Sequence, residues 1–153
     1  MKANPLFTIQ SIILADDDAD DRYVFQELIE EIHPKMQLEI VSNGLQLMKL
    51  LEHFAPDLLF LDLEMPYKNG LECLIDIRGN ERLKELPVVV FSSTTRPANI
   101  QTAYEMGAHL FLIKDASFQQ YSQSIQAILQ LNWKEPVKIK EQYCINDRYV
   151  VFS

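Results

Sequence analysis

The sequence lacks the features that mark membrane-embedded, secreted or metal-finger proteins. No apolar run approaches the ~20 residues that a membrane-spanning helix needs. The first ten residues contain one lysine and no long apolar stretch of the kind found in secretory signals. The two cysteines, Cys73 and Cys144, are far apart and fit no metal-binding spacing. We therefore expect a cytoplasmic protein with no membrane partner, whose cysteines are ordinary buried or partly buried thiols in a reducing compartment.

Basic residues are also scarce. Lysine and arginine number 14 against 22 aspartates and glutamates, which gives a net charge of -8. Because neutralising a phosphate backbone needs a basic face, we expect no nucleic-acid partner. The length of 153 residues suits one hydrophobic core, and the 48% of apolar residues is close to the average of soluble globular proteins. The acids are unevenly placed, since five of the ten aspartates lie between Asp16 and Asp21.

Short apolar runs alternate five times with amphipathic helical patterns. The runs are residues 11–15, 37–41, 58–61, 87–91 and 109–113. The third and fourth runs show no alternation of apolar and polar residues, as expected of central strands buried on both faces. Right-handed crossover connections would place helices on both faces of such a sheet. The sequence therefore predicts an α/β fold with a doubly wound, five-stranded parallel sheet.

In open parallel sheets, ligands bind at the carboxyl ends of the strands. The polar residues that follow the predicted strands are Asp16, Asp17 and Asp18, then Asp62, then Ser92 and Ser93, and finally Lys114. Carboxylates at one rim raise each other's pKa unless a cation neutralises them, and a set of oxygen ligands suits Mg²⁺. Lys114 and a serine hydroxyl could hold a phosphoryl group, which Asp62 could accept as an acyl phosphate. The pattern indicates a Mg²⁺-dependent phosphoryl site.

These residues, in this order, resemble the receiver domain of two-component response regulators. The resemblance covers about residues 12–132, and the segment from Asp62 to Gly70 (DLEMPYKNG) is similar to the phosphoacceptor loop of that family. It implies a flavodoxin-like (βα)5 fold with strand order 2-1-3-4-5. It also implies that Asp62 receives a phosphoryl group from a sensor histidine kinase or a phosphotransfer protein. The change would then be read by a downstream protein that the sequence does not identify.

The resemblance also assigns roles to single positions. Asp16 and Asp17 would bind Mg²⁺ together with Asp62 and the backbone carbonyl of Glu64. The remaining assignments are Ser92 as the switch hydroxyl, Phe111 as the switch aromatic residue and Lys114 as the lysine that contacts the phosphoryl group. In one respect the chain departs from the family, because Asp115 stands where a proline in a cis peptide usually follows the lysine. A cis bond without proline costs roughly 3 kcal/mol, so this loop is either trans and reshaped or cis and strained.

Four alternatives remain beside this interpretation. Asp18, Asp20 and Asp21 could simply be solvated acids at a helix start, where aspartate is favoured. The acids also fit positions 1, 3, 5 and 12 of an EF-hand loop, namely Asp16, Asp18, Asp20 and Glu27, but position 6 needs glycine and is Asp21. An enzymatic alternative is a phosphohydrolase of the haloacid dehalogenase type, which wants a second aspartate where this chain has Glu64. We expect no turnover enzyme, and a receiver-like scaffold that is never phosphorylated is the main rival.

We expect residues 1–132 to form the receiver domain and residues 133–153 to form a C-terminal extension. Two short β-prone segments flank Asn146 and Asp147, which predicts a β-hairpin. The hairpin would pack on its own domain or contribute to a homodimer. About twenty residues are too few for a DNA-binding output domain, so we expect a stand-alone receiver.

Overall fold

A computed structural model describes residues 8–114 and 117–153 of the chain. Its centre is a parallel sheet of five strands, β1 (Ser11–Ala15), β2 (Gln37–Val41), β3 (Leu58–Leu61), β4 (Val88–Ser92) and β5 (Leu110–Ile113). The strands lie in the order β2-β1-β3-β4-β5, with the reversal of order between β1 and β3. The predicted doubly wound sheet and its strand order are thereby confirmed.

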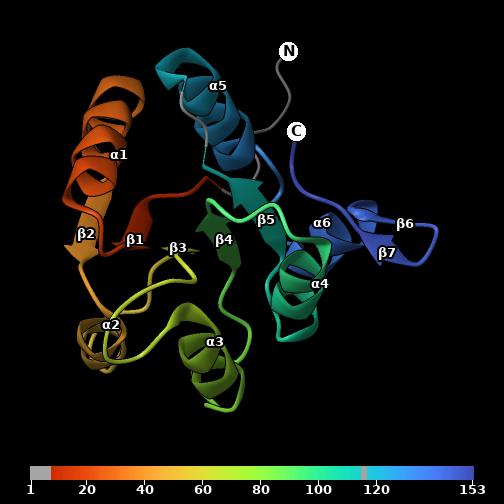
Figure 1. The fold of residues 1–153 in the computed structure, drawn as a ribbon. Coiled ribbons are helices and arrows are strands. Elements are labelled where there is room, and N and C mark those ends of the chain that lie inside the picture. The colour runs from red at the N-terminus through yellow and green to blue at the C-terminus, as the bar shows by residue number, and fades with distance from the viewer. Residues whose placement is uncertain (1–7, 115–116) are drawn as a thin grey trace.

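Helices cover both faces of this sheet (Figure 1). They are α1 (Ala19–Ile32), α2 (Gly44–Leu51), α3 (Gly70–Arg78), α4 (Pro97–Glu105), α5 (Phe118–Leu129) and the short α6 (Pro136–Gln142). Buried side chains of α2, α3 and α4 share one apolar cluster with the sheet, whereas those of α1, α5 and α6 share a second cluster on the opposite face. None of the described helices combines the length and the apolar character that crossing a membrane requires.

The strand sequences explain this three-layer arrangement. Successive residues of a strand point to opposite faces, so a strand covered on both sides must be apolar throughout. All four residues of β3 are fully buried, with Leu59 and Leu61 in the first cluster and Leu58 and Phe60 in the second. The sheet therefore supplies two cores at once, and the polar residues are displaced to the strand ends.

The sequence misjudged some side chains at the edges of these cores. The apolar period of residues 118–129 predicts that Phe118 and Tyr121 face inward. Phe118 is instead the first residue of α5 and is 51% exposed beside Tyr23 and Val24 of α1. Cys144 was expected to be at least partly buried and is exposed, because the hairpin that carries it projects from the domain. Helix α6 has seven residues and no clear apolar period, so the pattern did not reveal it.

The end of the chain returns to the domain after a short hairpin. Strands β6 (Cys144–Ile145) and β7 (Arg148–Tyr149) pair antiparallel around Asn146 and Asp147, whose φ angles of 54° and 63° suit a two-residue hairpin turn. The following residues run along β5, where the backbone N–H of Phe152 donates to the carbonyl of Phe111 at 2.8 Å. The C-terminal segment therefore covers the outer edge of the sheet.

Tyr104 of α4 fastens this segment to the domain. Its ring stacks on Tyr149 with centroids 4.5 Å apart. Its hydroxyl donates to the carbonyl of Val150 at 2.8 Å and accepts the backbone N–H of Phe111 at 3.0 Å. One buried hydroxyl therefore joins α4, β5 and the chain end.

Candidate functional site

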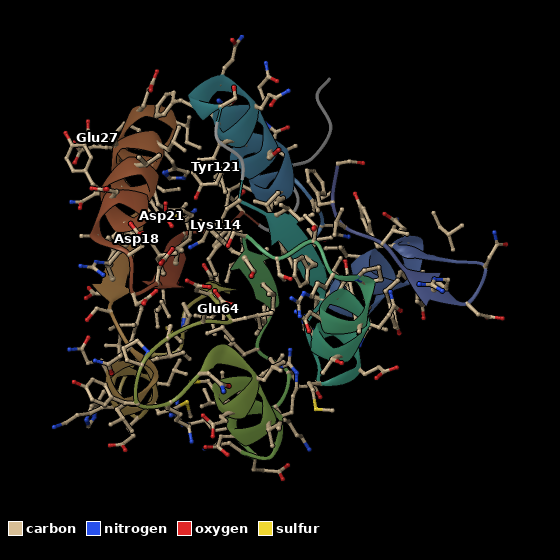
Figure 2. The ribbon with its side chains drawn as sticks, viewed as in Figure 1. Asp18, Asp21, Glu27, Glu64, Lys114 and Tyr121 are labelled. Carbon is tan, nitrogen blue, oxygen red and sulfur yellow. The ribbon has the colours of Figure 1, made fainter. Side chains whose placement is uncertain are left out.

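The carboxyl ends of three strands bring together residues that lie far apart in the sequence (Figure 2). Asp16 follows β1, Asp62 follows β3 and Lys114 follows β5. The N–H of Asp62 donates to the carbonyl of Ala15 at 2.9 Å, which continues the pairing of β1 with β3 and places the two aspartates side by side. The Lys114 ammonium lies 3.0 Å from Asp16 Oδ2 and 3.1 Å from Asp62 Oδ2.

Asp16, Asp17 and Asp62 form a cluster of carboxylates. Each offers an oxygen, and these oxygens lie within 4.8 Å of one another. Asp16 is fully buried and Asp62 is 4% exposed, whereas Asp17 faces solvent. Oxygen ligands alone, at this spacing and open to solvent on one side, fit a hard divalent cation such as Mg²⁺ that keeps several waters. Asp16, Asp17 and Asp62 are thus the residues that could hold a metal.

The electrostatics of the cluster favour a cation. Burial raises the pKa of both Asp16 and Asp62 above the ordinary carboxyl range. Backbone N–H groups oppose this rise, with Asp18 donating to Asp16 Oδ1 at 3.0 Å and Glu64 donating to Asp62 Oδ1 at 3.1 Å. Lys114 lowers both pKa values as well. A divalent ion would add the positive charge that keeps both carboxylates ionised.

Lys114 has a third acidic partner that the sequence did not predict. Asp21, in the first turn of α1, places Oδ2 2.7 Å from the ammonium. Burial lowers the pKa of Lys114, but the hydrogen bond to Asp21 and the charges of Asp62 and Asp16 outweigh it, so the pKa lies above its ordinary value. The ring of Phe91 lies 5.0 Å from the same nitrogen. Lys114 is therefore held as a cation between carboxylates and an aromatic face.

The start of α1 explains how Asp21 reaches this lysine. The side chain of Asp18 accepts the backbone N–H groups of Asp20 and Asp21 and so caps the helix. This placement agrees with the helix-start interpretation of Asp18, but it turns Asp21 toward the strand ends. Because strand β1 precedes the acidic segment where an EF-hand needs a helix, the EF-hand alternative fails. No local pattern separates Asp21 from its acidic neighbours, because its partner Lys114 lies 93 positions away in the sequence.

Ser92 and Phe111 occupy different surroundings. Ser92 ends β4, is buried, and its Oγ accepts the backbone N–H of Thr94 at 3.2 Å. Phe111 is fully buried in β5, in register with Val90, and bonds through its backbone to Tyr104 and the chain end. The structure thus places Ser92 at the rim that carries the carboxylates, and Phe111 in the core behind it.

The loop after β3 holds Asp62 through its backbone. Glu64 is exposed, and its N–H group donates to Asp62 Oδ1. The N–H of Gly70 returns to the carbonyl of Leu63 at 2.9 Å, and Asn69 caps α3 in a reciprocal pair with Glu72. A helix therefore starts where the loop closes. The residue after Lys114, Asp115, lies outside the described residues.

A buried tyrosine hydroxyl lies close to the site. Tyr121 of α5 packs edge-on against Phe91, with ring centroids 5.6 Å apart. Its hydroxyl is buried and has no hydrogen-bond partner among the residues that the structure describes. Burial and the charges of Asp16 and Asp21 raise its pKa, so this hydroxyl stays neutral. Its place near these two acids depends on how α5 packs against the sheet, which a sequence pattern does not report.

Comparison with known proteins gives a consistent result. Residues 12–126 match the family model described as the response regulator receiver domain. Response regulator Rcp1 of Synechocystis sp. is 29% identical over 135 residues, which cover 84% of this chain and 91% of the relative. The nitrate/nitrite response regulator protein NarL of Escherichia coli (strain K12) is 37% identical over 105 residues, or 69% of this chain and 48% of the relative.

Solved structures show the same fold. The phosphorylated cyanobacterial phytochrome response regulator RcpA superimposes with a TM-score of 0.73 at 28% identity, covering 78% of this chain and 91% of that one. The Mn²⁺-bound form of Rcp1 superimposes with a TM-score of 0.71 at 28% identity, with the same coverage. Some relatives are protein-glutamate methylesterases, such as that of Halalkalibacterium halodurans, of which this chain spans 30% at 34% identity. The similarity to those enzymes is limited to less than a third of their length.

Proposed function

Because the chain belongs to the receiver-domain family of response regulators, we propose that it carries a signal by accepting a phosphoryl group on Asp62. The observation that supports this proposal is the position of the Asp62 carboxylate, 3.1 Å from the Lys114 ammonium and inside a cluster of three acids. A nucleophilic oxygen, a fixed cation and a set of metal ligands are the three parts that phosphoryl transfer to a carboxylate needs.

Each residue has a defined task in this reaction. An Asp62 carboxylate oxygen attacks phosphorus and forms an O–P bond, while the bond from phosphorus to the donor breaks and its electrons leave with the donor. Lys114 stabilises negative charge on the phosphoryl oxygens. We assign Mg²⁺ to Asp16, Asp17, Asp62 and the backbone carbonyl of Glu64, where the ion would neutralise developing charge. The product is an acyl phosphate on the protein, and no other substrate is turned over.

The partners follow from this chemistry. The donor would be a histidine kinase or a phosphotransfer protein, since a phosphohistidine is a good source of a phosphoryl group for a carboxylate. We assign Ser92, at the same rim, as the residue whose hydroxyl turns toward the phosphoryl oxygens. We assign Phe111 as the residue that changes its packing in response and so alters the surface beside β5. A second protein would then read the altered surface.

The test is the intact mass of the chain after incubation with acetyl phosphate and Mg²⁺. The proposal expects one phosphoryl adduct in the wild type and none in Asp62→Ala. Asp20→Asn, an exposed acid of the same region, serves as the matched control and should keep the adduct. No adduct at any Mg²⁺ concentration would favour a scaffold that works without phosphorylation. Sustained release of phosphate from unrelated esters would favour the hydrolase.

A further inference from the structure

Three carboxylates crowd the Lys114 ammonium. An ammonium carries three N–H groups. Three carboxylate oxygens surround it, those of Asp21 at 2.7 Å, Asp16 at 3.0 Å and Asp62 at 3.1 Å. The ammonium donates hydrogen bonds to Asp21 and Asp62, whereas Asp16 Oδ2 faces it as an ion pair and accepts no hydrogen bond among the described residues. The shortest contact belongs to Asp21, the acid outside the cluster.

Asp21 differs from the other two acids in its surroundings. The side chains of Asp16 and Asp62 are almost completely buried, whereas that of Asp21 is 37% exposed. Asp16 and Asp62 share the cluster that could hold a metal, and Asp21 is not a member of it. It comes instead from α1 and reaches the ammonium from the side of that helix, as Figure 2 shows for Asp21 and Lys114. If Asp21 loses its contact with the lysine, water can replace the ammonium, whereas Asp16 or Asp62 would be left as a buried, unpaired charge.

A phosphoryl donor that approaches Asp62 meets a lysine that three carboxylates already contact. Until the new O–P bond forms, Asp62 remains an anion and keeps its own N–H contact with Lys114. The incoming phosphoryl oxygens therefore compete with these carboxylates for the ammonium. Because Asp21 is the most exposed of the three and makes the shortest contact, it is the competitor that can be displaced at the smallest cost.

We propose that Asp21 is a positioning residue that holds Lys114 and competes with the phosphoryl group for its ammonium, and so slows phosphoryl acceptance. This inference rests on the proposed function of Asp62. It assigns Asp21 a role in setting the speed of the response, separate from metal binding and from the chemical step. In the resting protein the same contact keeps the long lysine side chain ordered beside Asp62.

The rate test uses three variants. Asp21→Asn removes the ion pair, Asp21→Glu keeps the carboxylate, and Asp20→Asn removes the same unit charge from the same turn without breaking a contact to Lys114 among the described residues. We expect the rate of adduct formation with acetyl phosphate and Mg²⁺ to rise roughly three- to fivefold in Asp21→Asn, the upper part of the range of one partly exposed ion pair. Asp21→Glu should stay within about twofold of the wild type, as should Asp20→Asn.

An equilibrium measurement separates competition from a general loss of order. Beryllofluoride, a phosphoryl mimic, should bind Asp21→Asn more tightly than the wild type by a similar factor, while Mg²⁺ affinity changes little. Should Asp21→Asn fold poorly, Asp21→Ser makes the same test. Equal or slower acceptance and unchanged beryllofluoride affinity, relative to Asp20→Asn, would overturn the competition. A wild type that takes no adduct at all would instead overturn the proposed function.

Discussion

Gly70 packs so closely against the backbone of Asp62 that a Cβ atom at position 70 would overlap the Asp62 carbonyl oxygen. The first residue of α3 and the proposed phosphoacceptor therefore share one tight contact, which fixes where the loop between them can run.

Gly70→Ala should displace the Asp62 backbone. Because the overlapping atoms are backbone atoms that cannot rotate away, we expect a loss of about 1–3 kcal/mol in the free energy of unfolding, measured by urea denaturation. Phosphoryl acceptance should fall with it. Gly79→Ala is the control, since a Cβ at position 79 makes only ordinary contacts and this residue, which caps the end of α3, has αR backbone angles that alanine adopts readily. Equal stability of the two variants would contradict the close packing.

Asp16→Asn should have opposite effects with and without metal. In metal-free protein it removes a buried charge whose pKa burial has raised, so the free energy of unfolding should increase by about 1 kcal/mol. The amide oxygen can still accept the N–H of Asp18. Mg²⁺ affinity, measured by calorimetry, should fall at least about tenfold, because a charged ligand is lost. Unaltered Mg²⁺ binding would exclude Asp16 as a ligand.

His109 should make the fold sensitive to mild acid. It lies just before β5, where its Nδ1 accepts the N–H of Val88 at 3.1 Å. Burial, followed by the charge of Arg78, lowers its pKa from 6.5 to about 3. Below pH 6.5 the unfolded chain therefore binds a proton at His109, whereas the folded chain does not bind it until about pH 3. The free energy of unfolding consequently falls as the pH drops through this window.

The His109→Asn variant isolates this effect. Its side-chain oxygen can accept the same N–H but does not titrate. Near pH 5 the wild type should have lost roughly 2 kcal/mol relative to its value at neutral pH, beyond any loss in the variant. Other titrating groups, such as the buried aspartates, are common to both proteins and cancel in the difference. Parallel stability curves of the two proteins from pH 7 to 5 would show that His109 binds its proton as readily in the folded chain as in the unfolded chain.

Tyr104→Phe should loosen the chain end without changing the core volume. The substitution leaves the buried N–H of Phe111 without its acceptor and the carbonyl of Val150 without its donor. We expect a loss of about 1–3 kcal/mol and faster hydrogen exchange at the Phe111 amide. Tyr67→Phe, on a side chain that is 82% exposed, should change stability by less than about 0.5 kcal/mol. Slow exchange at Phe111 in the variant would mean that another group had replaced the hydroxyl.

The sequence predicted the sheet well because its strands are buried on both faces. A run such as 58–61 has no polar position, and only a central strand with cover on both sides accommodates this pattern. The same logic located Asp16, Asp62 and Lys114, because parallel strands all end at one edge of the sheet. The roles of these residues in metal binding and phosphoryl transfer stay predictions.

What escaped prediction depends on contacts between distant segments. The bond between Asp21 and Lys114 joins residues 93 positions apart, and neither residue alone distinguishes it from a solvated helix start. The Tyr104 hydroxyl likewise finds its partners only after α4 has packed on β5. The burial of Phe118 was predicted wrongly, because the helical period places a residue on one face of its helix but does not show whether a neighbouring element covers that position.

The two cysteines differ in reactivity because only one of them lies on the exposed C-terminal hairpin. Cys144 is exposed on the hairpin, whereas Cys73 is buried and burial raises its pKa to about 11. A maleimide dye should therefore react at Cys144 alone in the folded protein, because the thiolate is the reactive form. The wild-type chain thus provides its own labelling position for fluorescence, next to the segment that borders β5. Any rearrangement of that border could be followed without introducing a mutation.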